Sequence, residues 1–116
     1  MIQVSYRNKI LIAVEPIDFR KRLNGTAGVC RAKLELDPHN GVFYVFRNKS
    51  RTMIRIYFFD GLVEWGCDLR IACGKFPHWP TSDAPTCGLN AEQFYSLIKG
   101  GNPEDVKVLD CYKEIA

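Results

Sequence analysis

The segment that decides the fold is residues 41–61, GVFYVFRNKSRTMIRIYFFDG. Two runs in it, residues 42–47 and 53–59, are rich in the aromatic and β-branched side chains that are typical of strands. A short basic loop separates these runs, and Asp60-Gly61 is a strong signal for a tight hairpin turn. A third strand is expected at residues 62–69. The segment therefore predicts a three-stranded antiparallel meander.

The chain before this segment predicts a strand and a helix. Residues 10–14 read as a short buried strand. Asp18 is placed to cap a helical turn at residues 19–23. Apolar residues then recur at helical spacing, in a stripe made of Leu23, Ala27, Cys30 and Leu34.

The chain after it predicts two more helices. Asn90 and Gln93 resemble a capping box, and Gly100-Gly101 ends the helix that follows. Asn102-Pro103 combines a cap residue with proline at the first helical position, so an additional helix is expected within residues 101–116. The fold class is α+β: an antiparallel meander of three to four strands with helices packed on one face.

Length and composition indicate a single domain over residues 1–116. No apolar run approaches the length of a membrane-spanning helix, and no signal-peptide core is recognisable, so a cytoplasmic location without membrane contact is expected. The five cysteines are odd in number and contain no C-x-x-C pair, which favours free thiols. Cys67, Cys73 and His78 make only a weak metal-site pattern, and no cofactor is indicated.

The charge is distributed unevenly along the chain. Residues 1–59 carry eleven Lys or Arg and four Asp or Glu, whereas residues 60–116 carry five and nine. This polarity suits a protein that offers a basic surface to a polyanion. The alternative is that both halves fold into one unit and the charges mix on its surface.

The basic loop is the main candidate site. Arg47, Lys49, Arg51 and Arg55 lie within nine residues, and no acidic residue occurs between Arg47 and Asp60. Guanidinium groups match the geometry of phosphate oxygens, and a two-stranded ribbon fits a DNA major groove. The alternative is a solvated hairpin tip whose charges serve solubility.

A second basic cluster and one tryptophan are weaker candidates. Arg20-Lys21-Arg22 lies near an expected helix start, where a phosphate can bind. Taken alone, however, this cluster is better explained as a solvated helical turn in which Arg20 pairs with Asp18. Trp79 lies between prolines and reads as a plug that holds an irregular loop to the core, more than as a platform for a stacked base.

No catalytic centre is recognisable. The chain has no nucleophile elbow, no phosphate-binding glycine loop and no zinc-binding helix motif. Asp18, Asp37 and Asp60 occupy positions that capping and turn chemistry already explain. The sequence therefore predicts no catalytic residue and no resident metal.

A series of short motifs follows one another in order over residues 10–100. These are Asp18-Phe19-Arg20-Lys21, Asn24-Gly25, Asp37-Pro38, Gly41, Tyr44 through Lys49, Ile54 through Gly61, Gly74-Lys75-Phe76, Trp79-Pro80, and Leu89, Gln93, Leu97 and Gly100. In order and spacing they resemble the small TnpB-type accessory protein that is encoded by the second reading frame of the "sixty-six" group of bacterial insertion sequences. Phe58, Phe59 and Arg55 depart from that family's Trp and Lys pattern, which makes the chain a divergent member.

The resemblance implies a helper in DNA transposition, whose catalyst is a separate, larger transposase. It implies two partners, DNA (duplex rather than single-stranded) and the transposase of the same element, and it implies no known reaction, so we expect the protein not to be an enzyme. It favours the basic residues as nucleic-acid contacts: Arg47, Lys49, Arg51, Arg55, Arg20 and Lys21.

Two other functions stay open. One is a protein-interaction module that docks on a transposase without touching DNA, through an aromatic sheet face of Tyr57, Phe59 and Trp65. The other is a small metal-dependent enzyme that uses Asp, Glu and His side chains.

Overall fold

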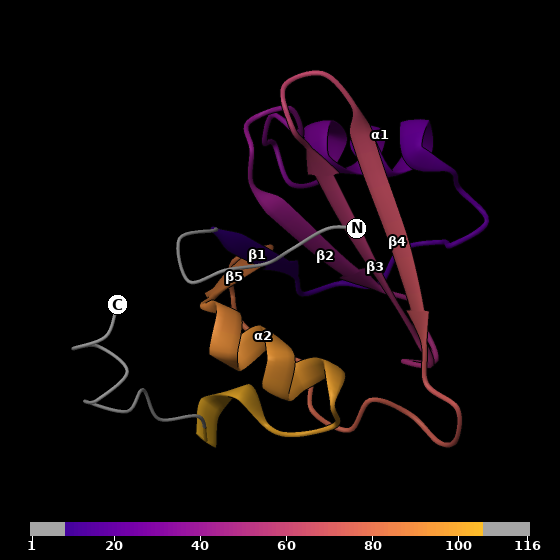
Figure 1. Ribbon diagram of the computed structural model, residues 1–116, viewed down its shortest axis with the longest axis vertical. Helices are drawn as coiled ribbons and strands as arrows, with labels where there is room; N and C mark the ends of the chain where they lie inside the picture. Colours follow the sequence, from indigo (N-terminus) through magenta and orange to yellow (C-terminus); the bar gives the residue numbers. More distant parts are fainter. Residues whose placement is uncertain (1–8, 106–116) are drawn as a thin grey trace.

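The structure, a computed structural model, describes residues 9–105 (Figure 1). It contains five strands and two α-helices, followed by one short 3-10 helix. The strands are β1 (Ile10–Ala13), β2 (Phe43–Arg47), β3 (Met53–Phe59), β4 (Glu64–Arg70) and β5 (Thr86–Leu89). The helices are α1 (Leu23–Ala32), α2 (Ala91–Ile98) and η1 (Pro103–Asp105).

The sheet is mixed, with the strand order β4-β3-β2-β1-β5. The predicted meander is confirmed, because β2, β3 and β4 pair antiparallel with their neighbours in sequence. The prediction of a purely antiparallel sheet of three to four strands is wrong: β1 runs parallel to β2, and β5 adds a fifth strand beside β1. The reason is α1, which carries the chain from the end of β1 back to its start and so forces a parallel crossover.

The core lies on both faces of this sheet. Phe43 and Val45 of β2 cluster with Phe94 and Leu97 of α2. Tyr44 and Phe46, which alternate with them along the strand, cluster with Ala27 and Cys30 of α1. Neighbouring residues of a strand point to opposite faces, so the two helices cover opposite faces, and the expectation of helices on one face is wrong. We call these clusters the α2-side core and the α1-side core.

Local sequence signals position most of the elements correctly. The predicted helical stripe is confirmed for Leu23, Ala27 and Cys30, which lie on α1 and contact one core. Leu34 packs against the same core from beyond the helix, which ends at Ala32. The capping box is present: the Asn90 side chain accepts from the Gln93 amide, and the Gln93 side chain accepts from the Asn90 amide. The helix predicted within residues 101–116 lies largely outside the described residues, apart from η1.

A turn at Asp60-Gly61 joins β3 to β4 as predicted, but the connection spans residues 60–63, so β4 runs from Glu64 to Arg70 and not over the expected residues 62–69. Gly61 has φ +101°, a left-handed value that favours glycine. The Asp60 carboxylate accepts from the amides of Leu62 and Val63 and from the indole of Trp65, the last at 2.7 Å. These hydrogen bonds lower the pKa of Asp60, the one from Trp65 most strongly. The turn is therefore held by its own side chains.

None of the helices in the described part of the chain is long and apolar enough to cross a membrane.

Two buried side chains, Cys30 and Tyr57, are expected to make the folded state less stable as the pH becomes alkaline. Burial raises the pKa of the Cys30 thiol from 9.0 to about 12 and that of the Tyr57 hydroxyl from 10.0 to about 12. Both groups ionise more easily in the unfolded chain, so their contribution to stability is complete below these ordinary pKa values and is lost as the pH rises through the folded ones. We expect the urea midpoint to fall between pH 9 and pH 12. A Cys30→Ala variant should show a smaller fall, and a midpoint constant over this range would contradict the prediction.

Candidate functional site

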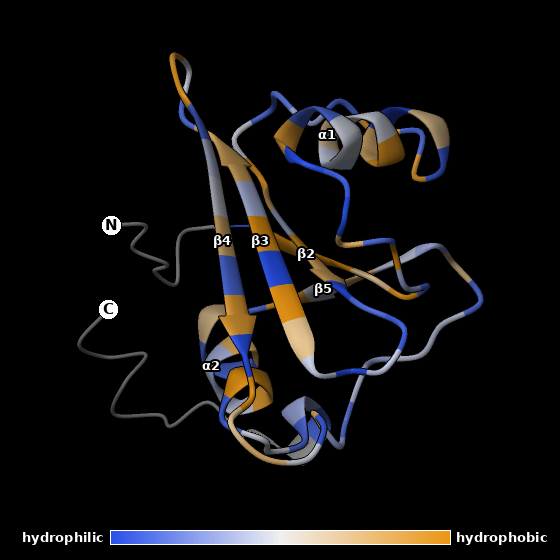
Figure 2. Cartoon of the chain, turned by 90° about the vertical axis from the view of Figure 1, so that its right-hand side faces the viewer, coloured by the Kyte–Doolittle hydropathy of each residue, from blue (hydrophilic) through white to orange (hydrophobic). Residues whose placement is uncertain are grey.

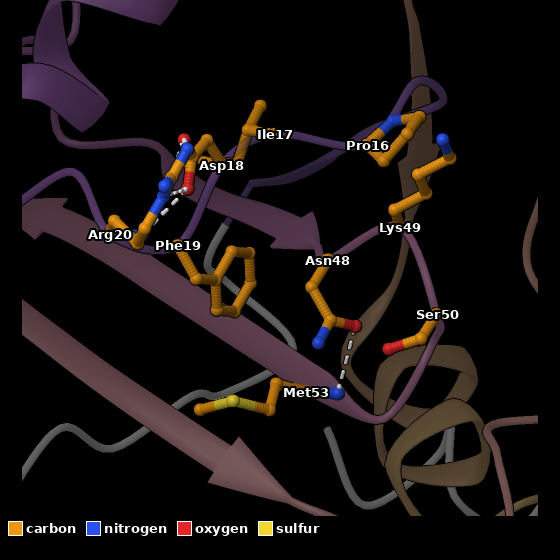
Figure 3. A pocket seen from close by; sticks show the side chains of 9 residues that line it. All are labelled: Pro16, Ile17, Asp18, Phe19, Arg20, Asn48, Lys49, Ser50 and Met53. Carbon is orange, nitrogen blue, oxygen red and sulfur yellow. Dashed lines mark hydrogen bonds and ion pairs between the residues drawn. The ribbon is translucent and has the colours of Figure 1, made fainter.

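The two basic clusters of the sequence meet at an open groove of about 780 Å³ (Figure 3). One wall is the segment from Pro16 to Arg20, which follows β1, and the other is the loop between β2 and β3. The groove is lined by Pro16, Ile17, Asp18, Phe19, Arg20, Asn48, Lys49, Ser50 and Met53. Its cations come from positions 20 and 49, which lie far apart in the sequence.

The two walls are tied together by the backbone. The amide of Ile17 donates to the carbonyl of Arg47 at 3.0 Å, so the first segment runs beside the end of β2. Ile17 is itself buried in the α1-side core. Asp18 then makes a turn, in which its carboxylate accepts from the Arg20 amide and its carbonyl accepts from the Lys21 amide. The expected helical turn at residues 19–23 is instead a bent segment, and α1 begins only at Leu23.

Arg55 organises this wall from inside the protein. Its side chain lies on the α1 face of β3 and forms a two-point ion pair with Asp68 of β4, at 2.8 and 3.0 Å. The guanidinium also donates to the carbonyls of Phe19 and Lys21 and to the Thr26 hydroxyl. It stacks over the Phe19 ring, 4.6 Å from the ring centre. Only 8% of Arg55, a nucleic-acid contact expected from the sequence, is exposed, and its guanidinium holds this wall in place from inside the protein.

The opposite wall is shaped by Asn48. Its side-chain oxygen accepts from the amides of Thr52 and Met53, and its side-chain nitrogen donates to the Thr52 hydroxyl (Figure 3 shows the bond to Met53). The Arg51 amide donates to the Asn48 carbonyl, and Arg51 adopts a left-handed φ of +59°. These hydrogen bonds hold the loop in one tight conformation. Among the described residues, no carboxylate forms an ion pair with Arg47, Lys49 or Arg51.

The cations of the loop point in different directions. Lys49 is exposed and lines the groove. Arg51 is half-buried and lines a smaller hollow of about 220 Å³ on another side of the loop, together with Trp79. Arg47 is also half-buried: its guanidinium donates to the carbonyls of Asn48 and Lys49 and lies 6.0 Å from the centre of the Trp79 ring. Burial, with a smaller effect of nearby Arg51, lowers the pKa of Arg47.

The second cluster is more exposed. The Arg20 side chain is 91% exposed and pairs with the Asp18 carboxylate at 2.8 Å. The hydrogen bonds from Arg20 lower the pKa of Asp18 to about 2. Lys21 and Arg22 are exposed as well. The groove is therefore lined by a partly neutralised cation, Arg20, and by the exposed Lys49, and the exposed Lys21 follows Arg20 next to it in the chain.

The remaining candidates are placed as follows. Trp79 donates from its indole to the Ala13 carbonyl at 3.0 Å and packs against the α2-side core, which supports its role as a plug. Tyr57 is fully buried, and Phe59 stacks on His39, so the expected aromatic contact face does not form. Within residues 9–105, no group of three or more His, Cys, Asp or Glu side chains is arranged to hold a metal ion.

Two site residues were not predicted from the sequence. Asn48 shapes the loop. An asparagine at the start of a short connection between two strands often stabilises the turn with its side chain, and this position could have identified it. Asp68 forms the ion pair that fixes Arg55. The two residues are directly opposite in the β3–β4 pairing, so their side chains lie on the same face of the sheet, but this register had to be known before Asp68 could be identified.

Comparisons with known proteins agree with this arrangement of motifs. Residues 8–108 match the family model described as IS66 Orf2 like protein. A relative, "Uncharacterized protein y4jC" of Sinorhizobium fredii (strain NBRC 101917 / NGR234), is 31% identical over 100 residues, which is 86% of this chain and 85% of that protein. No solved structure matches the chain. The family consists of accessory proteins of insertion-sequence transposition, and the chain belongs to it as an IS66 Orf2-like protein.

Proposed function

We propose that the protein is a non-enzymatic transposition factor that binds duplex DNA, alone or in an assembly with the transposase, through the cations around the groove. The contact residues are Arg20, Lys21 and Lys49, with Arg47 and Arg51 at the flank. Such a factor acts where the DNA is, in the cytoplasm.

The observation that carries the proposal is that two separate basic segments line one groove. Arg20 and Lys49 belong to different elements, yet both line it. Phosphates recur along both strands of a duplex, and several cations on one surface release several condensed counterions when they bind it. The Asn48 bonds hold the loop in its conformation before binding, so little ordering of the loop is needed when DNA binds.

The test is a salt titration of duplex DNA binding with a triple variant, Arg20→Ala/Lys21→Ala/Lys49→Ala. We expect its affinity at low salt to fall about tenfold or more, and the slope of log K against log salt to become shallower by about three, close to one per lost phosphate contact. Single-stranded DNA of the same length should bind less tightly than the duplex.

The matched control is Arg31→Ala/Lys33→Ala/Lys99→Ala, which removes the same residue types from exposed positions at the end of α1 and just after α1 and α2. Its net charge equals that of the test variant, so it measures the effect of total charge alone. Equal losses in the two variants would contradict the groove as the contact surface. Unchanged binding in the test variant would contradict the DNA contact altogether.

A second candidate function is docking on the transposase without DNA. The observation that favours it is the β3–β4 turn, where Leu62 is 86% exposed and Val63 is 48% exposed. Apolar side chains on a rigid turn are suited to a protein partner. Binding of the transposase that is lost in a Leu62→Ser variant but kept in the triple groove variant would support this function over DNA binding.

A further inference from the structure

Strand β4 has an unpaired edge within the described part of the chain. It lies at the end of the sheet, pairs there only with β3, and is seven residues long (Figure 2). An edge strand of this length presents a row of free N–H and C=O groups that can pair with another strand. The strand contains no proline that would block such pairing.

The hydrogen bonds at its ends show which backbone groups face outward. The Ile71 amide donates to the Thr52 carbonyl, and the Val63 carbonyl accepts from the Asp60 amide, so odd-numbered residues turn toward β3. Along an antiparallel strand, the amide and carbonyl groups of successive residues point alternately to one neighbouring strand and to the other side. The even-numbered residues therefore direct their amides and carbonyls to the free edge: Glu64, Gly66, Asp68 and Arg70.

We propose that this edge is the interface for a second copy of the chain. Two β4 strands would pair antiparallel about a two-fold axis at Cys67, independently of any DNA binding. In this register Glu64 lies opposite Arg70, Trp65 opposite Leu69, and Gly66 opposite Asp68, each pair occurring twice. The Glu64–Arg70 pairs are thus complementary in charge and the Trp65–Leu69 pairs are both apolar. The Glu64 carboxylate also lies 3.1 Å from His39 Nε2 of its own chain.

Other registers are disfavoured by the same residues. A two-fold axis at Gly66 places Glu64 opposite Asp68, and an axis at Asp68 places Asp68 opposite its own copy, so both bring like charges together. A two-fold axis that falls between two residues pairs each even-numbered residue with an odd-numbered one. The backbone groups of the even-numbered residue then point toward the partner strand and those of the odd-numbered residue point away, so no regular ladder forms. An axis at Leu69 also keeps the hydrogen-bonding phase and places Asp68 opposite Arg70, but it pairs only residues 68–70 of β4. The axis at Cys67 keeps the phase, brings opposite charges together and pairs the whole strand.

The side chains support the same register. Cys67 and Leu69 pack partly buried at the rim of the α2-side core, and Trp65, on the same face of the strand, is 37% exposed. Pairing would cover these three apolar side chains with their copies. Just beyond the strand ends, Val63 would lie opposite Ile71, another apolar pair. The product is a two-fold dimer whose two sheets form one continuous sheet.

Sedimentation velocity in reducing buffer, over a range of concentrations, tests the proposal by charge reversal. We expect the wild-type chain to form a dimer with a Kd in the micromolar range, as is usual for a small interface. An Arg70→Glu variant places Glu opposite Glu64 at both ends and should raise the Kd about tenfold or more. The swap Glu64→Arg/Arg70→Glu restores opposite charges and should restore the dimer.

Cross-linking tests the position of the axis. Cys67 would face its own copy in a non-hydrogen-bonded pair, with Cα atoms roughly 4.5 Å apart, within the range for a disulfide. A variant with Cys73, Cys87 and Cys111 changed to Ser should give a disulfide-linked dimer on oxidation with copper phenanthroline, and the further change Cys67→Ser should abolish it. Cys30 is fully buried and does not interfere.

Three results would overturn the proposal. They are a monomer at every concentration, a dimer that is unaffected by Arg70→Glu, and an oxidised sample in which Cys67 forms no cross-link although the dimer is present. Dimerisation that persists in the triple groove variant is expected, since the interface and the groove are formed by different residues.

Discussion

Replacing Arg55 by alanine is expected to lower the free energy of unfolding by about 3 kcal/mol. The side chain is buried, and its removal leaves the Asp68 carboxylate without its partner. It also leaves the Phe19 and Lys21 carbonyls without a donor. The Asp68 side chain is 37% exposed and can recover water, which places the expected loss at the lower end for a broken buried ion pair.

Urea unfolding followed by circular dichroism measures this effect. Arg55→Lys should recover only part of the loss, because an ammonium group cannot reach Asp68 and the Phe19 carbonyl in the planar arrangement of a guanidinium. The control is Lys49→Ala, an exposed cation in the loop between β2 and β3, which should change stability by no more than about 0.5 kcal/mol. An Arg55→Ala variant as stable as this control would show that the internal bonds contribute little.

Replacing Trp79 by alanine is expected to cost about 2 to 3 kcal/mol. The ring packs against the α2-side core, its indole donates to Ala13 of β1, and the Arg47 guanidinium lies near its face. Truncation removes this packing and leaves the Ala13 carbonyl without its donor. The value is below that of a fully buried tryptophan because Trp79 is only partly buried.

Thermal and urea unfolding, combined with DNA titration, separate the two roles of Trp79. As a plug, Trp79→Ala lowers stability, and Trp79→Phe, which keeps most of the apolar contact, lowers it less. As a stacking platform, Trp79→Ala would instead weaken nucleic-acid binding at unchanged stability, by about 1 to 3 kcal/mol per stacked base. That second outcome would contradict the structural role assigned here.

The elements that depend on local signals were predictable from the sequence. The strands of the meander, the Asp60-Gly61 turn and the capping box at Asn90 each rest on residues close together in the chain, and each forms as expected. The stripe of α1 was predictable for the same reason, since its spacing alone defines the buried face.

The features that depend on long-range pairing were not predictable in this way. The short strand β5 has no strong strand composition, and it forms because its backbone pairs with β1. The parallel pairing of β1 with β2 depends on where α1 crosses the sheet. The bent segment at residues 18–21 is held by Arg55, more than thirty positions away.

By itself, the sequence determined the family, the antiparallel meander and the presence of two basic segments, because motif order, strand composition and charge are properties of neighbouring residues. Only the tertiary structure decided which cations face solvent. Arg55 and Lys49 are both cations of the same basic segment in the sequence, but Asp68, Thr26 and two carbonyls surround Arg55, whereas nothing described covers Lys49. Burial and partners depend on which strands and helices lie across the sheet, and that information is spread over the whole chain.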